Sequence, residues 1–135
     1  NGACEAMKNA GAKRALVLPV SVPSHCSLMT DAAQEFAKSV DMVNFKIGNV
    51  VVLHNVDASA AEDVNEIKSK LVEQLHKPVL WTASVQKMQQ LGIEKIVELG
   101  PGKVLAGLTR RIDRSLSASA VIDTATLHST IEEIK

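Results

Sequence analysis

The chain has 135 residues, with 15 basic and 15 acidic side chains and a formal net charge of zero. This length is sufficient for one hydrophobic core. Balanced charge and an aromatic content of 2% argue against a nucleic-acid partner, because such proteins usually need a basic surface or aromatic stacking platforms. Since no apolar stretch approaches ~18 residues, we also expect no membrane association.

Two cysteines, Cys4 and Cys26, lie too far apart in the sequence for a C-x-x-C motif. Four histidines could in principle extend a metal-ligand set, namely His25, His54, His76 and His128. Their spacing with the cysteines matches no such set. We therefore expect free thiols of a cytoplasmic protein and no metal site. The three histidines other than His25 are expected to be structural or exposed.

The first elements in chain order are a helix over residues 3–10 and a buried strand over residues 14–20. Good helix formers fill the first segment, and Gly11 is suited to end it. A second helix is expected to begin at Ser27 or Thr30 and to run to about Val40. Its apolar face is expected to carry Leu28, Ala32, Phe36 and Val40.

The middle of the chain is expected to hold a strand and two helices. The β-branched run over residues 50–56 predicts a short buried strand. Residues 60–76 predict an amphipathic helix. Its inner face is expected to carry Val64, Ile67, Leu71 and Leu75, and its polar face Glu62, Asp63, Glu66, Lys70 and Glu73. Pro78 is expected to be the first residue of the next helix, in which Trp81 fills core and which stops at Gly92.

The last third alternates between short strands and helices. Strands are expected over residues 95–99 and 119–122, and helices over 103–112 and 125–134. This order predicts an α/β fold in which a parallel sheet is flanked by helices. The turn Gly100-Pro101-Gly102-Lys103 is not a phosphate-binding loop, because Val97 and Val104 stand where that motif needs glycine and a hydroxyl residue.

His25 lies on a proline-stiffened corner between an apolar run and a helix start. Pro19 and Pro23 each fix their own φ and restrict the residue before them. An imidazole held on a rigid loop is suited to be a general base for a nucleophile supplied from elsewhere. A partly exposed histidine without a catalytic role is the alternative. Cys26 follows directly, but adjacent turn residues rarely point the same way, so a Cys–His pair is disfavoured.

Three long runs occur in the order and at about the spacing of one enzyme family. They are L-P-V-S-V-P-S-H-C-S-L-M at residues 18–29, E-Q-L-H-K-P-V-L-W-T-A-S-V at 73–85 and E-L-G-P-G-K-V-L-A-G-L-T-R-R-I at 98–112. With these runs the chain resembles bacterial malonyl-CoA:acyl carrier protein transacylases. The resemblance implies transfer of malonyl from malonyl-CoA to the phosphopantetheine thiol of the carrier in fatty acid biosynthesis. It also implies that no metal or redox cofactor is needed.

The resemblance also implies a division of labour within the site. In the family the nucleophile is the serine of a G-H-S-x-G turn upstream of the histidine, and no G-x-S-x-G pattern occurs in these residues. His25 would be the general base, oriented by the main-chain carbonyl at the position of Gln74. The chain thus looks like the C-terminal part of the enzyme, without the nucleophile and the carboxylate-binding arginine. We expect it to be inactive without the N-terminal half.

The same resemblance suggests domains and a docking surface. Residues 1–20 would be the end of a small ferredoxin-like subdomain, and residues 21–135 part of the large α/β acyltransferase domain. The family docks its acidic carrier protein on basic residues, for which the candidates are Lys13, Arg14, Arg110 and Arg111, with Lys103 and Arg114 nearby in sequence. Scattered surface charge is the alternative interpretation. A fragment that binds the carrier protein without turnover is the alternative function.

Overall fold

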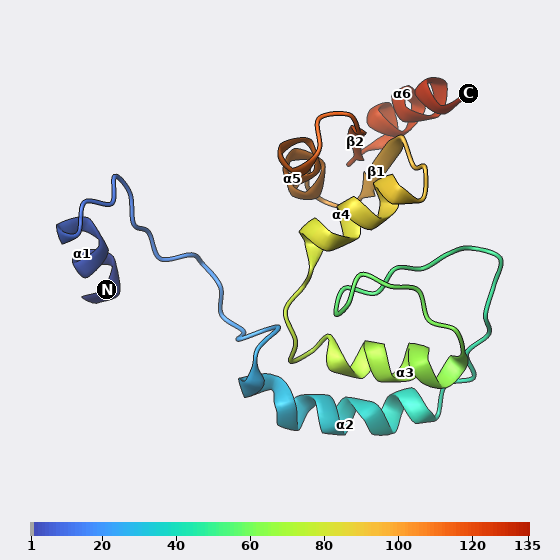
Figure 1. The fold of residues 1–135 in the computed structure, drawn as a ribbon, viewed down its shortest axis with the longest axis horizontal. Helices are drawn as coiled ribbons and strands as arrows, with labels where there is room; N and C mark the ends of the chain where they lie inside the picture. Colours follow the sequence, from blue (N-terminus) through green and yellow to red (C-terminus); the bar gives the residue numbers. More distant parts are fainter. Residues whose placement is uncertain (1) are drawn as a thin grey trace.

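A computed structural model describes residues 2–135 and shows an α/β fold (Figure 1). Its elements are α1 (Gly2–Asn9), the short 3-10 helix η1 (Ser27–Met29), α2 (Thr30–Asp41), α3 (Val64–Glu73), α4 (Trp81–Gln90), β1 (Lys95–Leu99), α5 (Val104–Ile112), β2 (Ser117–Val121) and α6 (Thr124–Ile134). The two strands pair in parallel, with Lys95 opposite Ser117 and Leu99 opposite Val121. The expected parallel sheet flanked by helices is confirmed.

The C-terminal body is built on this sheet. Helices α5 and α6 both pack against β2, and α4 packs against α5. Small buried side chains, Ala106 on α5 and Ala118 on β2, allow the helix to lie close to the strand. Thr109 is fully buried, and its hydroxyl donates to the carbonyl of Leu105 at 2.9 Å, so its polar group is satisfied.

Local capping decides where two of the helices begin. The Asp123 carboxylate accepts a hydrogen bond from the Thr126 amide at 2.8 Å, and the Thr126 hydroxyl accepts one from the Asp123 amide at 3.0 Å, which is a capping box for α6. Asp63 caps α3 in the same way by accepting from the Glu66 amide at 2.8 Å. Helix α3 therefore begins after Asp63, later than the predicted residue 60.

Helix α4 begins at Trp81, so the prediction that Pro78 opens it is wrong by three residues. The chain between α3 and α4 is instead held by the Leu80 amide, which donates to the carbonyl of Asn55 at 2.8 Å. The predicted stop is confirmed, because Gly92 has a φ of 80° just beyond the helix. Strand β2 begins at Ser117, two residues before its predicted start.

Helices α2 and α3 run antiparallel and form a second body (Figure 1). The predicted apolar face of α2 is largely wrong: Ala33 and Val40 are buried against α3, whereas Leu28 and Phe36 are exposed. The side of α2 that meets α3 therefore runs through Ala33 and Val40, of which the sequence predicted only Val40. On α3, Lys70 is buried rather than on the polar face, because the loop over residues 53–60 covers it.

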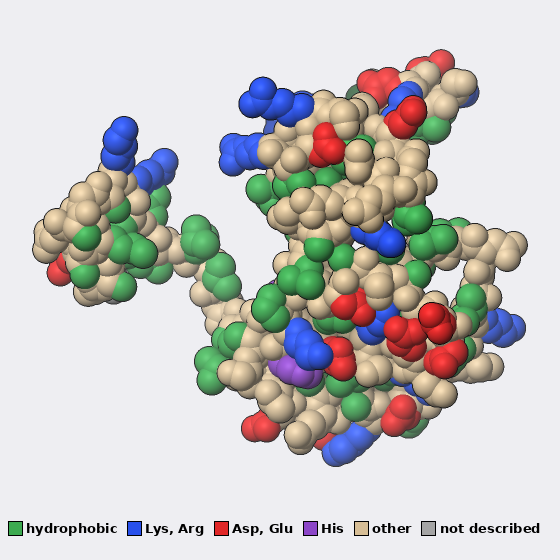
Figure 2. Space-filling view, viewed as in Figure 1, with side chains coloured by type: hydrophobic (Ala, Val, Ile, Leu, Met, Phe, Trp, Pro, Cys, Tyr) green, Lys and Arg blue, Asp and Glu red, His purple; other side chains and the backbone are tan. Residues whose placement is uncertain are grey.

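Residues 14–20 do not form the predicted strand. Within residues 2–135 this segment has no ladder with a neighbouring strand, and a strand needs one to pair its amides and carbonyls. Leu16, Val17 and Leu18 are exposed instead. Figure 1 shows the segment as an extended link from α1 to α2, and Figure 2 shows apolar side chains along its surface. The predicted helix before it is confirmed as α1.

The predicted strand over residues 50–56 is also wrong. In the part of the chain that the structure describes, its pairing is limited to an isolated antiparallel bridge between Leu53 and Ala60. Val50 is 79% exposed. Val52 instead lines an open apolar groove with Trp81 of α4 and Ile96 of β1. Trp81 therefore faces this groove as well as the protein interior, and is only half-buried.

Candidate active site

His25 is held in a backbone conformation that few residues other than glycine adopt. Its φ is 63°, in the left-handed region, which costs a non-glycine residue about 1–2 kcal/mol. The His25 amide donates to the carbonyl of Leu75, beyond the end of α3, at 3.0 Å. This contact joins the proline corner to a segment fifty residues later. Strain of this kind persists only where surrounding contacts fix it, and it is common at functional sites.

The imidazole of His25 is oriented by a main-chain carbonyl. Its Nδ1 lies 2.7 Å from the carbonyl oxygen of Gln74, the C-cap residue of α3. A helix end leaves such carbonyls without intrahelical partners, so this one is available. Because a carbonyl only accepts hydrogen bonds, Nδ1 carries the proton and Nε2 keeps its lone pair. The exposed ring can therefore accept a proton from outside at Nε2.

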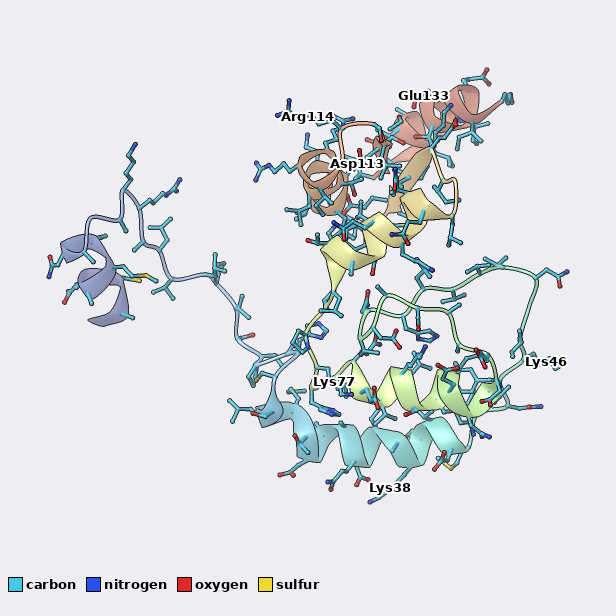
Figure 3. All side chains as sticks on the ribbon, viewed as in Figure 1. Lys38, Lys46, Lys77, Asp113, Arg114 and Glu133 are labelled. Atoms are coloured by element: carbon cyan, nitrogen blue, oxygen red, sulfur yellow. The ribbon has the colours of Figure 1, made fainter. Side chains whose placement is uncertain are left out.

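The turn that carries this carbonyl is held by the neighbouring loop. Asn55, which precedes α3 in the chain, contacts both ends of the segment that joins α3 to α4: its Nδ2 is 3.5 Å from Gln74 Oε1, and its carbonyl accepts from the Leu80 amide at 2.8 Å. Figure 3 shows Lys77 at the same corner, where the chain leaves α3 near the start of α2. The sequence analysis did not identify Asn55 as a residue of the site. The feature that marks it is that a polar residue interrupts the apolar, β-branched run over residues 50–56.

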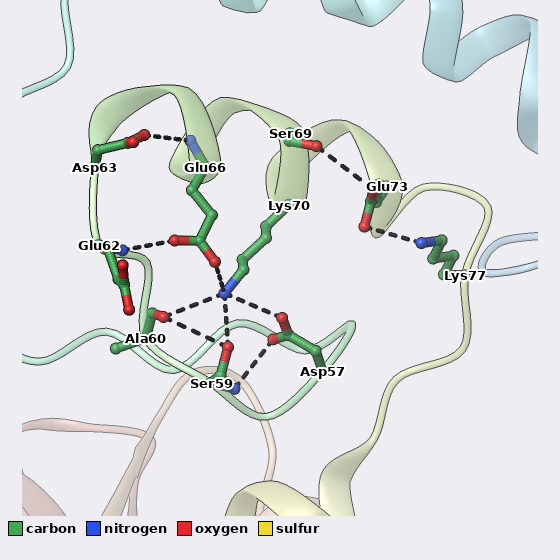
Figure 4. A network of polar contacts seen from close by, with 10 residues as sticks. All are labelled: Asp57, Ser59, Ala60, Glu62, Asp63, Glu66, Ser69, Lys70, Glu73 and Lys77. Carbon is green, nitrogen blue, oxygen red and sulfur yellow. Dashed lines mark hydrogen bonds and ion pairs between the residues drawn. The ribbon is translucent and has the colours of Figure 1, made fainter.

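A buried ammonium group ties that loop to α3 (Figure 4). The Lys70 residue is only 5% exposed. Its Nζ lies 2.6 Å from Ser59 Oγ, 2.7 Å from Glu66 Oε1 and 3.0 Å from Asp57 Oδ2. These three contacts match the three N–H bonds of an ammonium, and the Ala60 carbonyl lies slightly farther away at 3.2 Å. Two carboxylates and a hydroxyl thus offset the cost of burying the charge.

The ionisation of this cluster follows from its contacts. Burial opposes the charged form of Lys70, but hydrogen bonds to Glu66 and Asp57 outweigh it and raise the pKa of the ammonium. The pKa of Glu66 is lowered by the Glu62 amide and then by Lys70. For Asp57, burial acts against ionisation, but the bonds from Lys70 and Ser59 lower its pKa. All three groups are therefore charged near neutral pH.

His54 lies beside the cluster and is buried, with 8% of the residue exposed. Burial and then the Lys70 charge lower the pKa of its imidazole below 6.5, although Asp57 and Glu66 act in the opposite direction. The lowered pKa favours the neutral imidazole, and the burial of His54 agrees with the prediction that this histidine is structural or exposed. Among the described residues, no three acidic, cysteine or histidine side chains are placed to hold a metal ion.

Both cysteines are free thiols in the structure, in agreement with the sequence. The Cys26 thiol donates to the carbonyl of Pro23, with Sγ 3.1 Å from the oxygen. This contact directs it along its own loop rather than towards the imidazole of His25. A Cys–His nucleophile pair therefore gains no support from the geometry.

The basic candidates for carrier-protein docking lie in two places. Lys13 and Arg14 are exposed on the link after α1, and Arg110 and Arg111 are exposed in the last turn of α5. Arg110 is the most constrained, since its Nη2 donates to the carbonyl of Ala118 at 2.6 Å. Figure 2 shows basic side chains both on the N-terminal segment and around α5, separated by open space. The structure does not bring them into one continuous patch.

These observations define an α/β chain with an exposed histidine that is oriented by a helix-end carbonyl. No protein-family model matches the chain. The malonyl CoA-acyl carrier protein transacylase of Salmonella typhimurium is 48% identical over 128 residues, which is 95% of this chain and 41% of that protein. The resemblance seen in the three sequence runs is thus confirmed, and the chain spans about 40% of the length of the curated relatives it matches.

Solved structures agree with this similarity. The crystal structure of malonyl-CoA:acyl carrier protein transacylase from Xanthomonas oryzae has a TM-score of 0.89 and 39% identity, covering 97% of this chain and 42% of that one. A complex of a type II PKS acyl-carrier protein with its malonyl-transacylase gives a TM-score of 0.88 and 46% identity, with 97% and 42% covered. The chain is therefore similar, along nearly all of its length, to about two fifths of a malonyl-transacylase.

Among residues 2–135, no helix combines the length and the apolar character that crossing a bilayer requires.

Proposed function

We propose that this chain supplies the histidine half of a malonyl-CoA:acyl carrier protein transacylase of fatty acid biosynthesis, in which His25 is the general base. One observation carries the proposal: the 2.7 Å contact between His25 Nδ1 and the Gln74 carbonyl oxygen, which leaves Nε2 free to take a proton. The similarity to malonyl-transacylases supports the substrate class. The reaction needs no metal or redox cofactor and takes place in the cytoplasm.

In this mechanism the nucleophile is a serine hydroxyl that the rest of the enzyme supplies. His25 Nε2 takes the serine proton as the oxygen attacks the malonyl thioester, and the departing coenzyme A sulfur receives that proton. The phosphopantetheine thiol of the carrier then gives its proton to Nε2 and attacks the malonyl-serine ester. The serine oxygen leaves and recovers the proton. Without that serine the chain is inactive.

The two-part domain arrangement belongs to the same proposal. Residues 1–20 would close a ferredoxin-like subdomain, and residues 21–135 would complete the large acyltransferase domain together with the N-terminal half of the enzyme. Lys13 and Arg14 would meet the acidic carrier from the first part, and Arg110 and Arg111 from the second. Their separation on the surface fits a partner that bridges two subdomains. Such charges would mainly steer the encounter.

The test is a hybrid enzyme in which this chain replaces the matching residues of the Salmonella typhimurium relative. We expect the hybrid to transfer malonyl from malonyl-CoA to holo acyl carrier protein, and the 135-residue chain alone to transfer none. In the hybrid, His25→Asn should lower the rate by at least about a hundredfold, because general base catalysis contributes on that scale. Asparagine is the suitable replacement since it tolerates the left-handed backbone of residue 25.

Two controls separate catalysis from folding. His128→Asn changes an exposed histidine on α6 and should leave the rate unchanged. Gln74→Ala should reduce the rate much less than His25→Asn does, because the carbonyl that orients His25 belongs to the main chain and only the 3.5 Å contact between Asn55 Nδ2 and Gln74 Oε1 is lost. A folded hybrid that retains full activity with His25→Asn would refute the role of the base. If the hybrid binds carrier protein without transfer, the alternative of a non-catalytic carrier-binding module is favoured.

A further inference from the structure

We propose that Lys70 is a positioning residue for His25, acting through the loop over residues 53–60 and the Gln74 carbonyl. The inference rests on the proposed function, in which His25 is the base. It concerns a residue that touches neither the imidazole nor the expected substrate. The amphipathic pattern of α3 predicted that Lys70 faces solvent, but the residue is buried.

The Lys70 ammonium holds a loop against α3. Glu66 belongs to α3 itself, whereas Asp57, Ser59 and Ala60 belong to the loop that covers the helix (Figure 4). The loop closes on itself through the Ala58 amide, which donates to the His54 carbonyl at 2.9 Å, and the His54 amide, which donates to the Ser59 carbonyl at 2.9 Å. Lys70 thus fastens a small, internally hydrogen-bonded turn onto α3.

The loop in turn contacts the segment that joins α3 to α4. Asn55 lies within the same turn, two residues before Asp57. Its side chain approaches Gln74 Oε1 and its carbonyl binds the Leu80 amide, so it contacts the chain on both sides of the turn between α3 and α4. That turn presents the Gln74 and Leu75 carbonyls, to which His25 donates through Nδ1 and its main-chain amide. A continuous path of contacts therefore links Lys70 to the imidazole.

The position of the Gln74 carbonyl determines the tautomer of His25. The Gln74 carbonyl lies at a helix terminus, where backbone geometry is least restrained and ends readily fray. A shift of that oxygen lengthens the bond to Nδ1 and removes the preference for the tautomer whose lone pair is on Nε2. Misplacement of a reacting group by about 1 Å can lower a rate by about a hundredfold. Fixing the terminus from the loop side is thus a way to fix the base.

The test compares Lys70→Met with Lys77→Met. Methionine keeps an unbranched chain of similar length and removes the charge. Lys77 is the matched control, since it pairs with Glu73 at 3.0 Å at the end of the same helix but is half exposed. The first readout is the His25 tautomer, measured by imidazole nitrogen NMR on the chain. The second is the pH profile of malonyl transfer by the hybrid enzyme.

We expect Nδ1–H to be the main tautomer of His25 in the unmodified chain and in Lys77→Met. In Lys70→Met the Nε2–H form should become substantial, the apparent pKa in the pH profile should move, and kcat should fall by about tenfold to a hundredfold. KM for malonyl-CoA should change by less than about twofold, because Lys70 is not placed to bind substrate. Lys70→Arg, which keeps the charge, should recover part of the Nδ1–H population.

Asp57→Asn is the second variant in case Lys70→Met does not fold. It removes one ion pair on the loop side and should produce the same tautomer change to a smaller extent. A folded Lys70→Met or Asp57→Asn chain whose His25 tautomer and pH profile match the unmodified protein would overturn the proposal. The tautomer is measured without any substrate, so the two proposals can fail separately. If Lys70→Met changes the His25 tautomer but the unmodified hybrid transfers no malonyl, the proposed function is rejected and the positioning role of Lys70 is retained.

Discussion

The left-handed backbone of His25 predicts that glycine at this position gives a more stable protein than alanine. Elsewhere glycine is usually the more destabilising of the two replacements. Any substitution removes the bond to the Gln74 carbonyl, which contributes about 0.5–1.5 kcal/mol. His25→Ala keeps the strain of a positive φ, since alanine also has a Cβ. His25→Gly relieves about 1–2 kcal/mol of that strain. It also loses about 0.5–1 kcal/mol through the greater freedom of glycine in the unfolded chain.

The difference between these two terms places His25→Gly about 0.5–1 kcal/mol above His25→Ala in free energy of unfolding, and close to the unmodified protein. Urea unfolding followed by circular dichroism measures the difference as a shift in midpoint at constant slope. Both variants lack the imidazole, so both should be inactive in the hybrid enzyme. If His25→Ala were as stable as His25→Gly, the backbone at residue 25 would not be strained, and the reasoning about a fixed corner would fail.

Two further predictions concern the neutral histidine and a helix cap. Because burial and Lys70 lower the pKa of His54, the unfolded chain binds its proton more readily, so the stability present above pH 6.5 should decline as the pH falls below it. Urea midpoints at pH 7.5 and 5.5 should show this decline. The decline should be smaller in His54→Asn and unchanged in His128→Asn. An equal decline in the unmodified protein and both variants would contradict the assignment of the pH dependence to His54. Asp123→Ala removes the capping box of α6 and should lower the free energy of unfolding by about 1 kcal/mol, whereas Asp31→Ala, which lies in α2 but is not its N-cap residue, should change it less. Thermal unfolding of the two variants tests this, and equal melting temperatures would show that the cap contributes nothing.

Elements that depend on nearby residues were predicted well from the sequence. β1, α5 and α6 have their expected places, and Gly92 ends α4 as predicted. Capping side chains and glycines act within three or four residues, so their effect is encoded in a short stretch of sequence, although the Asp63 cap that starts α3 was not predicted. The free thiols and the overall α/β pattern follow from similarly local or compositional information.

Features that depend on distant residues were predicted poorly or only through the family resemblance. The apolar segments 14–20 and 50–56 read as strands, but a strand exists only where a neighbour pairs with it. The periodicity of α3 placed Lys70 on the polar face, because nothing within the helix shows that Asp57 and Ser59 will fold over it. The face of α2 was likewise decided by the approach of α3.

The candidate site illustrates the same division. Prolines around His25 predicted a rigid corner, and the resemblance named Gln74 as the residue whose carbonyl would meet the ring. The sequence alone does not show that His25 and Gln74, which are 49 positions apart, lie in contact. Tertiary structure decided that contact, the positive φ of His25 and the burial of Lys70. Each of these features arises where segments distant in sequence pack together. The periodicity of one segment does not show which other segment will pack against it.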